Sequence, residues 1–304
     1  MVFFYNESMS MINIIGAACM DILISSVDRD TFFSGKQKVD TIRMYPGGDA
    51  LNEALILSHF KADTKLISVL GDDQTGRFLL GHMKAENLAY NEDILKKKME
   101  TYLSLVMVDQ NGERTFVGNR NGSLRKLDLS HIRIDEDAKI VCLASVFISE
   151  KLRNEELCDL FTSIKKKGKI LCADCSTPKH GETLKEMDCL RYVDHFFCNE
   201  TEAAALCETK DVSEMDLLFK EHGVNAYIKC GEKGCYHDGR YFHGTPLKHV
   251  VDTTGAGDSF AAGFLLSLSK GGSIEGCIRQ GNEFGRKACE YLGATEWIKH
   301  EECA

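Results

Sequence analysis

Proline is scarce in this chain, with three residues among 304. There is no proline-rich linker, internal repeat or low-complexity segment, so a division into separate domains is not indicated. A chain of this length can bury a large core, and 43% apolar with 27% charged residues is an ordinary globular composition. We expect one α/β domain over residues 11–304, preceded by a disordered extension over residues 1–10.

Long hydrophobic runs are also missing. No apolar stretch approaches the roughly 18–20 residues that a helix needs to span a membrane, and the N-terminus lacks the basic start and long apolar core of a signal peptide. We therefore expect a cytoplasmic protein without membrane contact. The net charge of −9 argues against a nucleic-acid partner, because such proteins usually carry a basic face. Nucleotide binding stays open, since backbone amides, a helix terminus and Mg²⁺ can hold phosphates.

Two common nucleotide-binding patterns do not occur. The chain has no Gly-x-x-x-x-Gly-Lys-Ser/Thr segment, which excludes a P-loop enzyme. The run from Gly16 to Asp21, GAACMD, lacks the Gly-x-Gly-x-x-Gly spacing of a dinucleotide site.

Cysteine, in contrast, is abundant and odd in number, with 13 residues. Most lie in apolar runs such as IVCLAS around Cys142, and free cysteine behaves as a small buried hydrophobe. The Cys-x-x-Cys pair at 172–175 has no second pair and no histidine spacing that would indicate zinc. We interpret the cysteines as core residues in a reducing cytoplasm.

Strand-like and helix-like segments alternate along most of the chain. Residues 12–17, INIIGA, form a short apolar run typical of a buried strand, and residues 49–60 have helical spacing of apolar residues. The alternation resumes in the second half, with a strand over 169–174 and a helix over 255–268 among others. This order predicts a mostly parallel sheet with helices on both faces.

Two segments interrupt this alternation. Residues 22–44 hold two extended stretches, and residues 102–120 read as a hairpin whose turn contains Asn111-Gly112. Extended segments inserted between βα units predict a small sheet beside the main one. Such a sheet could cover a cleft as a lid.

The strongest chemical signal is the run from Asp252 to Phe264, DTTGAGDSFAAGF, which joins an apolar strand end to a long apolar helix. Gly255 and Gly257 permit a tight turn that exposes backbone amides at the positive end of the helix, where negative charge is stabilised. Asp258, in the first turn, could take a proton from an alcohol lying there. The same residues also suit an ordinary helix entry with a capping Asp, and composition leaves both interpretations open.

Three motifs resemble signatures of the ribokinase (PfkB-type) family of carbohydrate kinases. DTTGAGDSFAAGF resembles the C-terminal signature, Pro46–Ala54 the Gly-Gly-x-x-x-Asn-x-Ala stretch, and Asn199–Glu202 the Asn-x-x-Glu motif. The matches run in order from about residue 12 to residue 297. The resemblance implies a ribokinase-like α/β fold with a small β-sheet lid, and an ATP-dependent kinase that uses Mg²⁺.

The resemblance assigns catalytic roles to the C-terminal motif. Asp258 matches the base that deprotonates the attacking hydroxyl, expected to be a primary alcohol. The amides of Gly255, Ala256 and Gly257 match the anion hole. Asp252 falls near the family's monovalent-cation loop, so activation by K⁺ is a further expectation.

A second group of residues matches the nucleotide side of the family's site. Asn199 and Glu202 correspond to the residues that organise Mg²⁺, its waters and the phosphates, with Glu202 acting largely through water; a helix cap is the alternative. Gly231 and Gly234 fall where the nucleotide passes, and Asn282 on the adenine side. All three could also be plain turn or surface residues.

On the acceptor side, the resemblance implies that Asp21 and Asn52 contact substrate hydroxyls, with Gly48 and Asp49 beside them in the same signature. Departures from the family appear here. Cys19 stands where ribokinases tend to have Asn, and Asp49 where they tend to have Lys. Each change alters a hydrogen-bonding group facing the sugar, so ribose is not the favoured substrate.

Ser145 and Arg120 bear on the identity of the acceptor. Ser145 stands in place of an acidic ribose contact. Arg120 resembles the lid arginine of 2-keto-3-deoxygluconate kinases, and a guanidinium binds a carboxylate bidentately. We hypothesise a sugar or sugar-acid substrate, against the alternative of a solvated charge or an intersubunit ion pair.

Two other functions are alternatives for a chain with these motifs. A nucleoside kinase of the same family would need aromatic lid contacts, and the pattern shows no clear stacking pair; a catalytically quiet sugar-binding regulator is disfavoured by the intact motifs. Relatives often pair their lids, so a homodimer is expected. The lid residues expected to share one apolar face are Leu103, Leu105, Met107 and Phe116.

Overall fold

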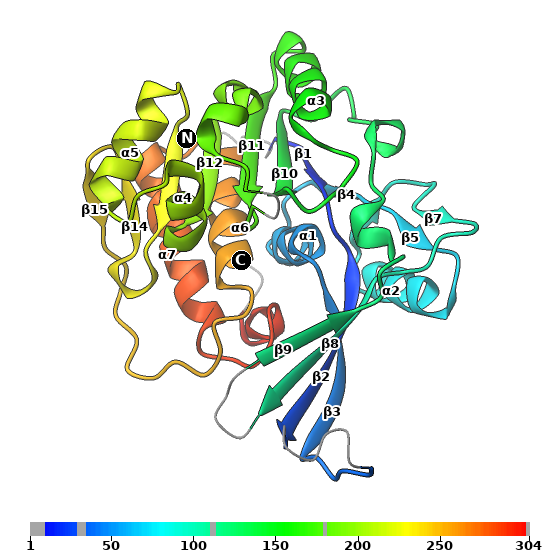
Figure 1. The fold of residues 1–304 in the computed structure, drawn as a ribbon. Helices are drawn as coiled ribbons and strands as arrows, with labels where there is room; N and C mark the ends of the chain where they lie inside the picture. Colours follow the sequence, from blue (N-terminus) through cyan, green and yellow to red (C-terminus); the bar gives the residue numbers. More distant parts are fainter. Residues whose placement is uncertain (1–9, 29–34, 110–113, 179–180, 302–304) are drawn as a thin grey trace, which may run out of the picture.

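The computed structural model describes residues 10–28, 35–109, 114–178 and 181–301. A nine-stranded sheet with the order β15-β14-β13-β12-β11-β10-β1-β4-β6 forms its centre (Figure 1). Its strands pair in parallel from β6 to β13, and β14 and β15 complete it as an antiparallel hairpin. The bounds are β1 Ile12–Ile15, β4 Thr64–Ile67, β6 Ala89–Tyr90, β10 Ile140–Val146, β11 Ile170–Cys175, β12 His195–Asn199, β13 Ala226–Lys229, β14 Cys235–His237 and β15 Arg240–Phe242.

Helices cover both faces of this sheet, as the alternation of segments predicts. One apolar core cluster joins the sheet to α1, α2, α6 and α7, and a second joins its other face to α3, α4 and α5. In the described part of the chain, no helix has the length and hydropathy needed to cross a membrane. The bounds are α1 Asp49–His59, α2 Gln74–Ala85, α3 Asn154–Lys166, α4 Glu200–Cys207, α5 Val212–Glu221, α6 Ala256–Ser269 and α7 Ile274–Ala288.

A separate four-stranded sheet, in the order β3-β2-β8-β9, projects below the large sheet in the view of Figure 1. It is built from the two segments that interrupt the βα alternation. A further short pair, β5 with β7, lies outside both sheets. The bounds are β2 Cys19–Val27, β3 Thr41–Gly47, β8 Leu103–Asp109, β9 Arg114–Gly118, β5 Leu70–Gly71 and β7 Leu95–Lys96.

The register of the small sheet corrects one expectation about its apolar face. Phe116 lies directly opposite Val106, whereas Leu105 lies opposite Val117. Because successive residues of a strand point to opposite faces, Phe116 does not share a face with Leu105. Phe116 is instead on the face that carries Asp21, which pairs with Ser104.

The other face of the small sheet is apolar. The residues that the register places on it are Ile22 and Ile24 of β2, Ile42 and Met44 of β3, Leu103, Leu105 and Met107 of β8, and Val117 of β9. We call this set the outer lid face. Three of its side chains are largely exposed, Ile42 at 65%, Met44 at 51% and Val117 at 47%.

Candidate active site

The first turn of α6 brings Asp258 against the first turns of α1. Nδ2 of Asn52 donates a hydrogen bond of 2.7 Å to Oδ2 of Asp258, across 206 positions of sequence. The other amide atom, Oδ1 of Asn52, is buried and has no hydrogen-bond partner among the described residues. A buried acceptor without a donor is costly, so Oδ1 is suited to receive a hydroxyl group from a ligand.

The loop before Asp258 is fixed by close backbone packing. Gly255 begins α6 with φ of 75°, and a Cβ there would lie 2.5 Å from Cα of Ala294. Asp252 is buried, and its carboxylate accepts hydrogen bonds from the amides of Thr254 and Gly293, each 3.0 Å long. Glycine at 255 is therefore required both by the left-handed backbone and by the lack of space.

The amides of this loop are only partly available. The amide of Ala256 donates a bond of 3.2 Å to the carbonyl of Thr253. In the described part of the chain, the amides of Gly255 and Gly257 make no backbone hydrogen bond outside the regular helices. These two N–H groups, on partly buried glycines, are the ones that the helix start can offer to an anion.

Acidic side chains gather at the neighbouring start of α1. Ser145, in β10, donates a hydrogen bond from Oγ to Oδ2 of Asp49, and Asp21 lies close to both Cys19 and Asp49. A side chain at position 47 would collide with the carboxylate of Asp21, so Gly47 makes room for it. Burial, reinforced by the charge of Asp49, raises the pKa of Asp21 to about 6.

Gly48 and Glu53 complete the α1 side of the site. Gly48 caps the helix with φ of 97°, and a Cβ there would lie 2.7 Å from the carbonyl oxygen of Ala17. Glu53 is fully buried, and its Oε2 accepts a contact of 3.5 Å from Sγ of Cys142. Burial and the nearby carboxylates raise the pKa of Glu53 well above its ordinary value. Sequence reasoning missed Glu53, which lies in the middle of an otherwise apolar helix face.

Asn199 and Glu202 form a capping box at the start of α4. Oδ1 of Asn199 accepts from the amide of Glu202 at 2.9 Å, and Oε2 of Glu202 accepts from the amide of Asn199 at 2.8 Å. Glu202 is 8% exposed, and burial raises its pKa despite the opposing charge of Lys229. The structure thus shows the helix cap that was the alternative interpretation. The second carboxylate oxygen of Glu202 lies outside this capping box.

A buried ion pair at the same edge was missed in the sequence. Nζ of Lys229, the last residue of β13, lies 2.8 and 2.7 Å from the two carboxylate oxygens of Asp174 in β11. Burial raises the pKa of Asp174 to about 7 although Lys229 opposes the shift. Opposite charges at the ends of two predicted strands were the available signal.

The remaining residues expected on the nucleotide side lie beyond β13. Nδ2 of Asn282, in α7, donates a bond of 2.7 Å to the carbonyl of Phe242 and lies 3.1 Å from the Cβ position of Gly234. Gly234 has φ of 88° with no room for a side chain. Gly231 is exposed, with φ of 55° and nothing within 4 Å of its Cβ position. The structure therefore brings Gly234 and Asn282 together and leaves Gly231 at the surface.

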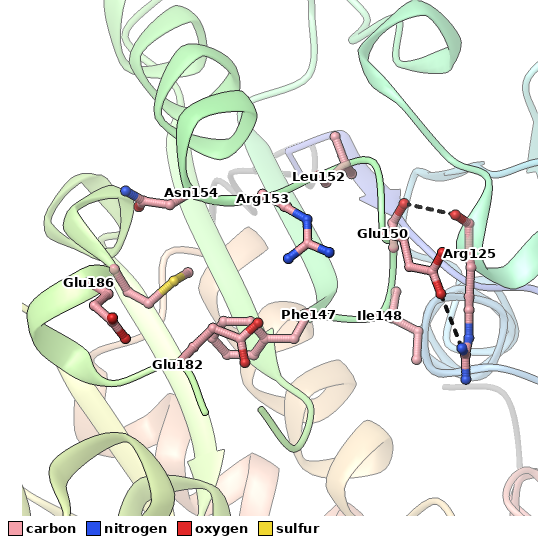
Figure 2. Close-up of a pocket in the computed structure, with 11 residues that line it drawn as sticks. Arg125, Phe147, Ile148, Glu150, Leu152, Arg153, Asn154, Glu182 and Glu186 are labelled. Carbon is pink, nitrogen blue, oxygen red and sulfur yellow. Dashed lines mark hydrogen bonds and ion pairs between the residues drawn. The ribbon is translucent and has the colours of Figure 1, made fainter. Parts of the chain in front are cut away.

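Arg120 is exposed in the turn after β9. A cavity of about 410 Å³ lies between Arg125 and the loop that follows β10. Figure 2 shows the guanidinium of Arg153 pointing into it, while Arg125 pairs with Glu150 at 3.1 Å on one side. The cavity is lined by Arg125, Phe147, Ile148, Ser149, Glu150, Leu152, Arg153, Asn154, Glu182, Glu186 and Met187.

The family model for pfkB family carbohydrate kinases matches residues 9–301, nearly the whole chain. The chain belongs to this family. It is 29% identical over 288 residues to a 2-dehydro-3-deoxygluconokinase of Haemophilus influenzae, covering 86% of this chain and 91% of that protein. It is 27% identical over 275 residues to a fructosamine kinase of Bacillus subtilis, covering 84% and 87% of the two chains.

Solved structures give the same fold. A ribokinase from Thermotoga maritima superposes with a TM-score of 0.77 at 23% identity, over 96% of this chain and 98% of that one. A ribokinase from Arabidopsis thaliana, complexed with ribose and ATP, superposes with a TM-score of 0.79 at 22% identity, over 95% of each chain. The ribokinase-like α/β fold predicted from the sequence is confirmed.

Family membership confirms that the protein is a carbohydrate kinase, an enzyme that transfers a phosphoryl group from ATP to an alcohol of a sugar or sugar acid. Enzymes of this kind use ATP with Mg²⁺. Among the described residues, no group of three or more His, Cys, Asp or Glu side chains could hold a metal ion. One carboxylate oxygen of Glu202 lies outside the capping box. The residues present therefore fit a Mg²⁺ ion that is held mainly by phosphate oxygens and water, which is the usual arrangement for this ion.

Proposed function

We propose that Asp258 is the general base of the kinase and that the loop of Gly255, Ala256 and Gly257 binds the transferred phosphoryl group, chiefly through the amides of Gly255 and Gly257. The hydrogen bond from Asn52 to Asp258 supports this proposal, because it joins the carboxylate to a side chain whose other, buried amide atom has no partner among the described residues. A substrate hydroxyl that donates to Oδ1 of Asn52 would then lie near both the Asp258 carboxylate and the amides of the loop. Burial, together with Asp49, raises the pKa of Asp258, which strengthens it as a base.

We propose that the nucleotide lies along the ends of β12 and β13 and over α7. Asn199 and Glu202 would orient Mg²⁺ and its waters, because their capping box fixes one carboxylate oxygen of Glu202 and leaves the other outside the box. Gly231, Gly234 and Asn282 would border the nucleotide farther along the same edge.

K⁺ activation is proposed for the loop that Asp252 ties to Gly293. A monovalent cation bound there would act on the same loop that supplies the amides. Assays in KCl against NaCl at equal ionic strength test it, and equal rates in the two salts would contradict it.

For the acceptor, we propose contacts with Asp21, Gly48, Asp49 and Asn52, and a carboxylate contact with Arg120. A sugar acid is favoured because Arg120 is exposed in the turn that follows a lid strand. The relative from Haemophilus influenzae is a kinase of a sugar acid, which supports this choice. An Arg120→Ala enzyme with an unchanged KM for its best anionic substrate would contradict it.

A panel assay identifies the acceptor. ADP release is measured in a coupled assay with ATP, Mg²⁺ and a set of sugars, sugar acids and nucleosides, and the product is checked by phosphorus NMR. We expect turnover on a sugar acid, with phosphate on a primary hydroxyl. Turnover restricted to neutral sugars would move the proposal to a neutral acceptor, and tight binding without turnover would indicate a regulator.

A nucleoside acceptor is the second candidate, on one observation. Phe116 is 65% exposed and lies on the lid face that carries Asp21, so an aromatic ring is available to stack on a base. Nucleoside turnover that is weakened by Phe116→Ala would favour this candidate over the sugar acid.

We also propose that residues 11–304 act as one kinase domain, with residues 22–44 and 102–120 as its lid. The enzyme is proposed to be a homodimer joined through the outer lid face, whose exposed apolar side chains need cover. The expected extension over residues 1–10 lies outside the described residues except for Ser10. Free cysteines, most of them buried, suit the cytoplasm that we propose for this protein.

A further inference from the structure

Lys229 lies between the ends of three parallel strands and the start of α6. In the register of the sheet, Lys229 pairs with Asn199 of β12, and Asp174 of β11 pairs with Phe197 of the same central strand. The Lys229 side chain therefore crosses over β12, and its ammonium group reaches Asp174 on β11. On its other side, Nζ lies 3.3 Å from the position that a Cβ of Gly257 would occupy. Lys229 therefore lies against the amide loop that we propose as the anion hole.

The charge around Lys229 is strongly negative. Burial alone would lower its pKa, but Asp174, Glu202 and Asp258 outweigh burial and raise it, so the ammonium stays charged. The side chain of Lys229 is 15% exposed and that of Asp174 is 5% exposed. A triphosphate entering among these carboxylates meets repulsion that a fixed cation offsets, and an ammonium is a compact point charge suited to phosphate.

We propose that Lys229 is a catalytic residue that binds a non-bridging oxygen of the γ-phosphoryl group, with Asp174 holding the ammonium in place until the nucleotide arrives. This inference rests on the proposed function, since it takes the 255–257 loop as the anion hole. In the transfer, the acceptor oxygen forms a bond to the γ-phosphorus while the bond from that phosphorus to the β–γ bridging oxygen breaks. The acceptor proton passes to Asp258, ADP leaves, and Lys229 keeps its protons throughout.

The competing explanation is a purely structural ion pair that fastens β11 to β13. Such a pair would matter equally through either partner, because removing one charge leaves the other buried and unpaired. The proposed role is unequal: the cation acts on phosphate, and the carboxylate only positions it. Nucleotide affinity separates the two explanations without any acceptor, and so does not depend on which sugar the enzyme uses.

The test compares Lys229→Met with Asp174→Asn, with the double variant and with Lys169→Met as the matched control. Lys169 is another buried lysine beside β11, bonded to the carbonyls of Asp135, Glu136 and Ala138. Dissociation constants for ATP and AMP, both with Mg²⁺, are measured by calorimetry. We expect Lys229→Met to weaken ATP binding about tenfold, with AMP unchanged within about twofold, and Lys169→Met to alter neither.

Turnover and melting complete the test. With the acceptor found in the panel, kcat should fall roughly 100-fold in Lys229→Met, as for loss of one anion-hole donor, and about fivefold or less in Asp174→Asn. The double variant, which removes both charges of the Lys229–Asp174 pair, should fold and keep the Lys229→Met defect. Equal losses of Tm in both single variants, with ATP affinity unchanged and the double variant restored, would overturn the proposal. A wild-type enzyme that binds neither nucleotide would overturn the proposed nucleotide site itself.

Discussion

The carboxyl group of Asp258 combines a position in the first turn of α6 with a hydrogen bond from Asn52. Replacement by Asn preserves the shape of the side chain and removes the proposed base. We expect Asp258→Asn to lower kcat by about 10³-fold with the KM for ATP little changed, because general-base catalysis contributes about 10²–10⁴-fold. Steady-state kinetics check this, with Asp211→Asn, at the exposed cap of α5, as the control. A loss below tenfold would show that another group takes the proton.

Asp21 gives a prediction about pH and stability. Its pKa is about 6 in the folded protein and 3.8 as the ordinary value, so the folded state holds the proton more tightly than the unfolded state. Stability is therefore lost as pH rises from about 4 to about 6, and stays lower above that. Asp21→Asn should raise the free energy of unfolding at pH 7.5 by at most about 3 kcal/mol, and change it little at pH 4.

Denaturant unfolding at the two pH values measures this difference. The same variant should lose turnover, because the proposed contact with a substrate hydroxyl is altered. Equal stability of wild type and variant at pH 7.5 would contradict the raised pKa of Asp21.

The turn into α6 shows how an element depends on one backbone position. Gly255 has φ of 75° and its Cβ position meets Ala294, whereas Gly223, after α5, has φ of 73° and open space around its Cβ position. Gly223→Ala should cost only the left-handed backbone penalty, roughly 1–2 kcal/mol. Gly255→Ala should cost more and also abolish most activity, since the amide loop must shift.

Thermal melting and kcat measured on both variants separate the two effects. Because φ is nearly the same at the two positions, the difference between them reports the contact with Ala294. Matching losses would indicate that the loop tolerates the shift.

At the scale of the whole molecule, we propose that the outer lid face determines assembly. We expect a dimer in solution, and Ile42→Lys combined with Met44→Lys should dissociate it, because two charges would be buried at the interface. Leu217→Lys is the control, since Leu217 is 55% exposed on α5, which lies far from the small sheet in Figure 1. Light scattering at micromolar concentration measures the mass, and a monomeric wild type would contradict the prediction.

The sequence by itself determined the α/β fold and the kinase family, because the decisive signals are local. The run from Asp252 to Phe264 is contiguous, and a strand end, a glycine turn and a helix start can be read from adjacent residues. The tertiary structure alone decided which distant groups meet. Lys229 and Asp174 are 55 positions apart and touch only because β11, β12 and β13 align in parallel. The face of Phe116 was likewise decided by strand register, which composition does not encode, since a shift of one residue reverses every side chain.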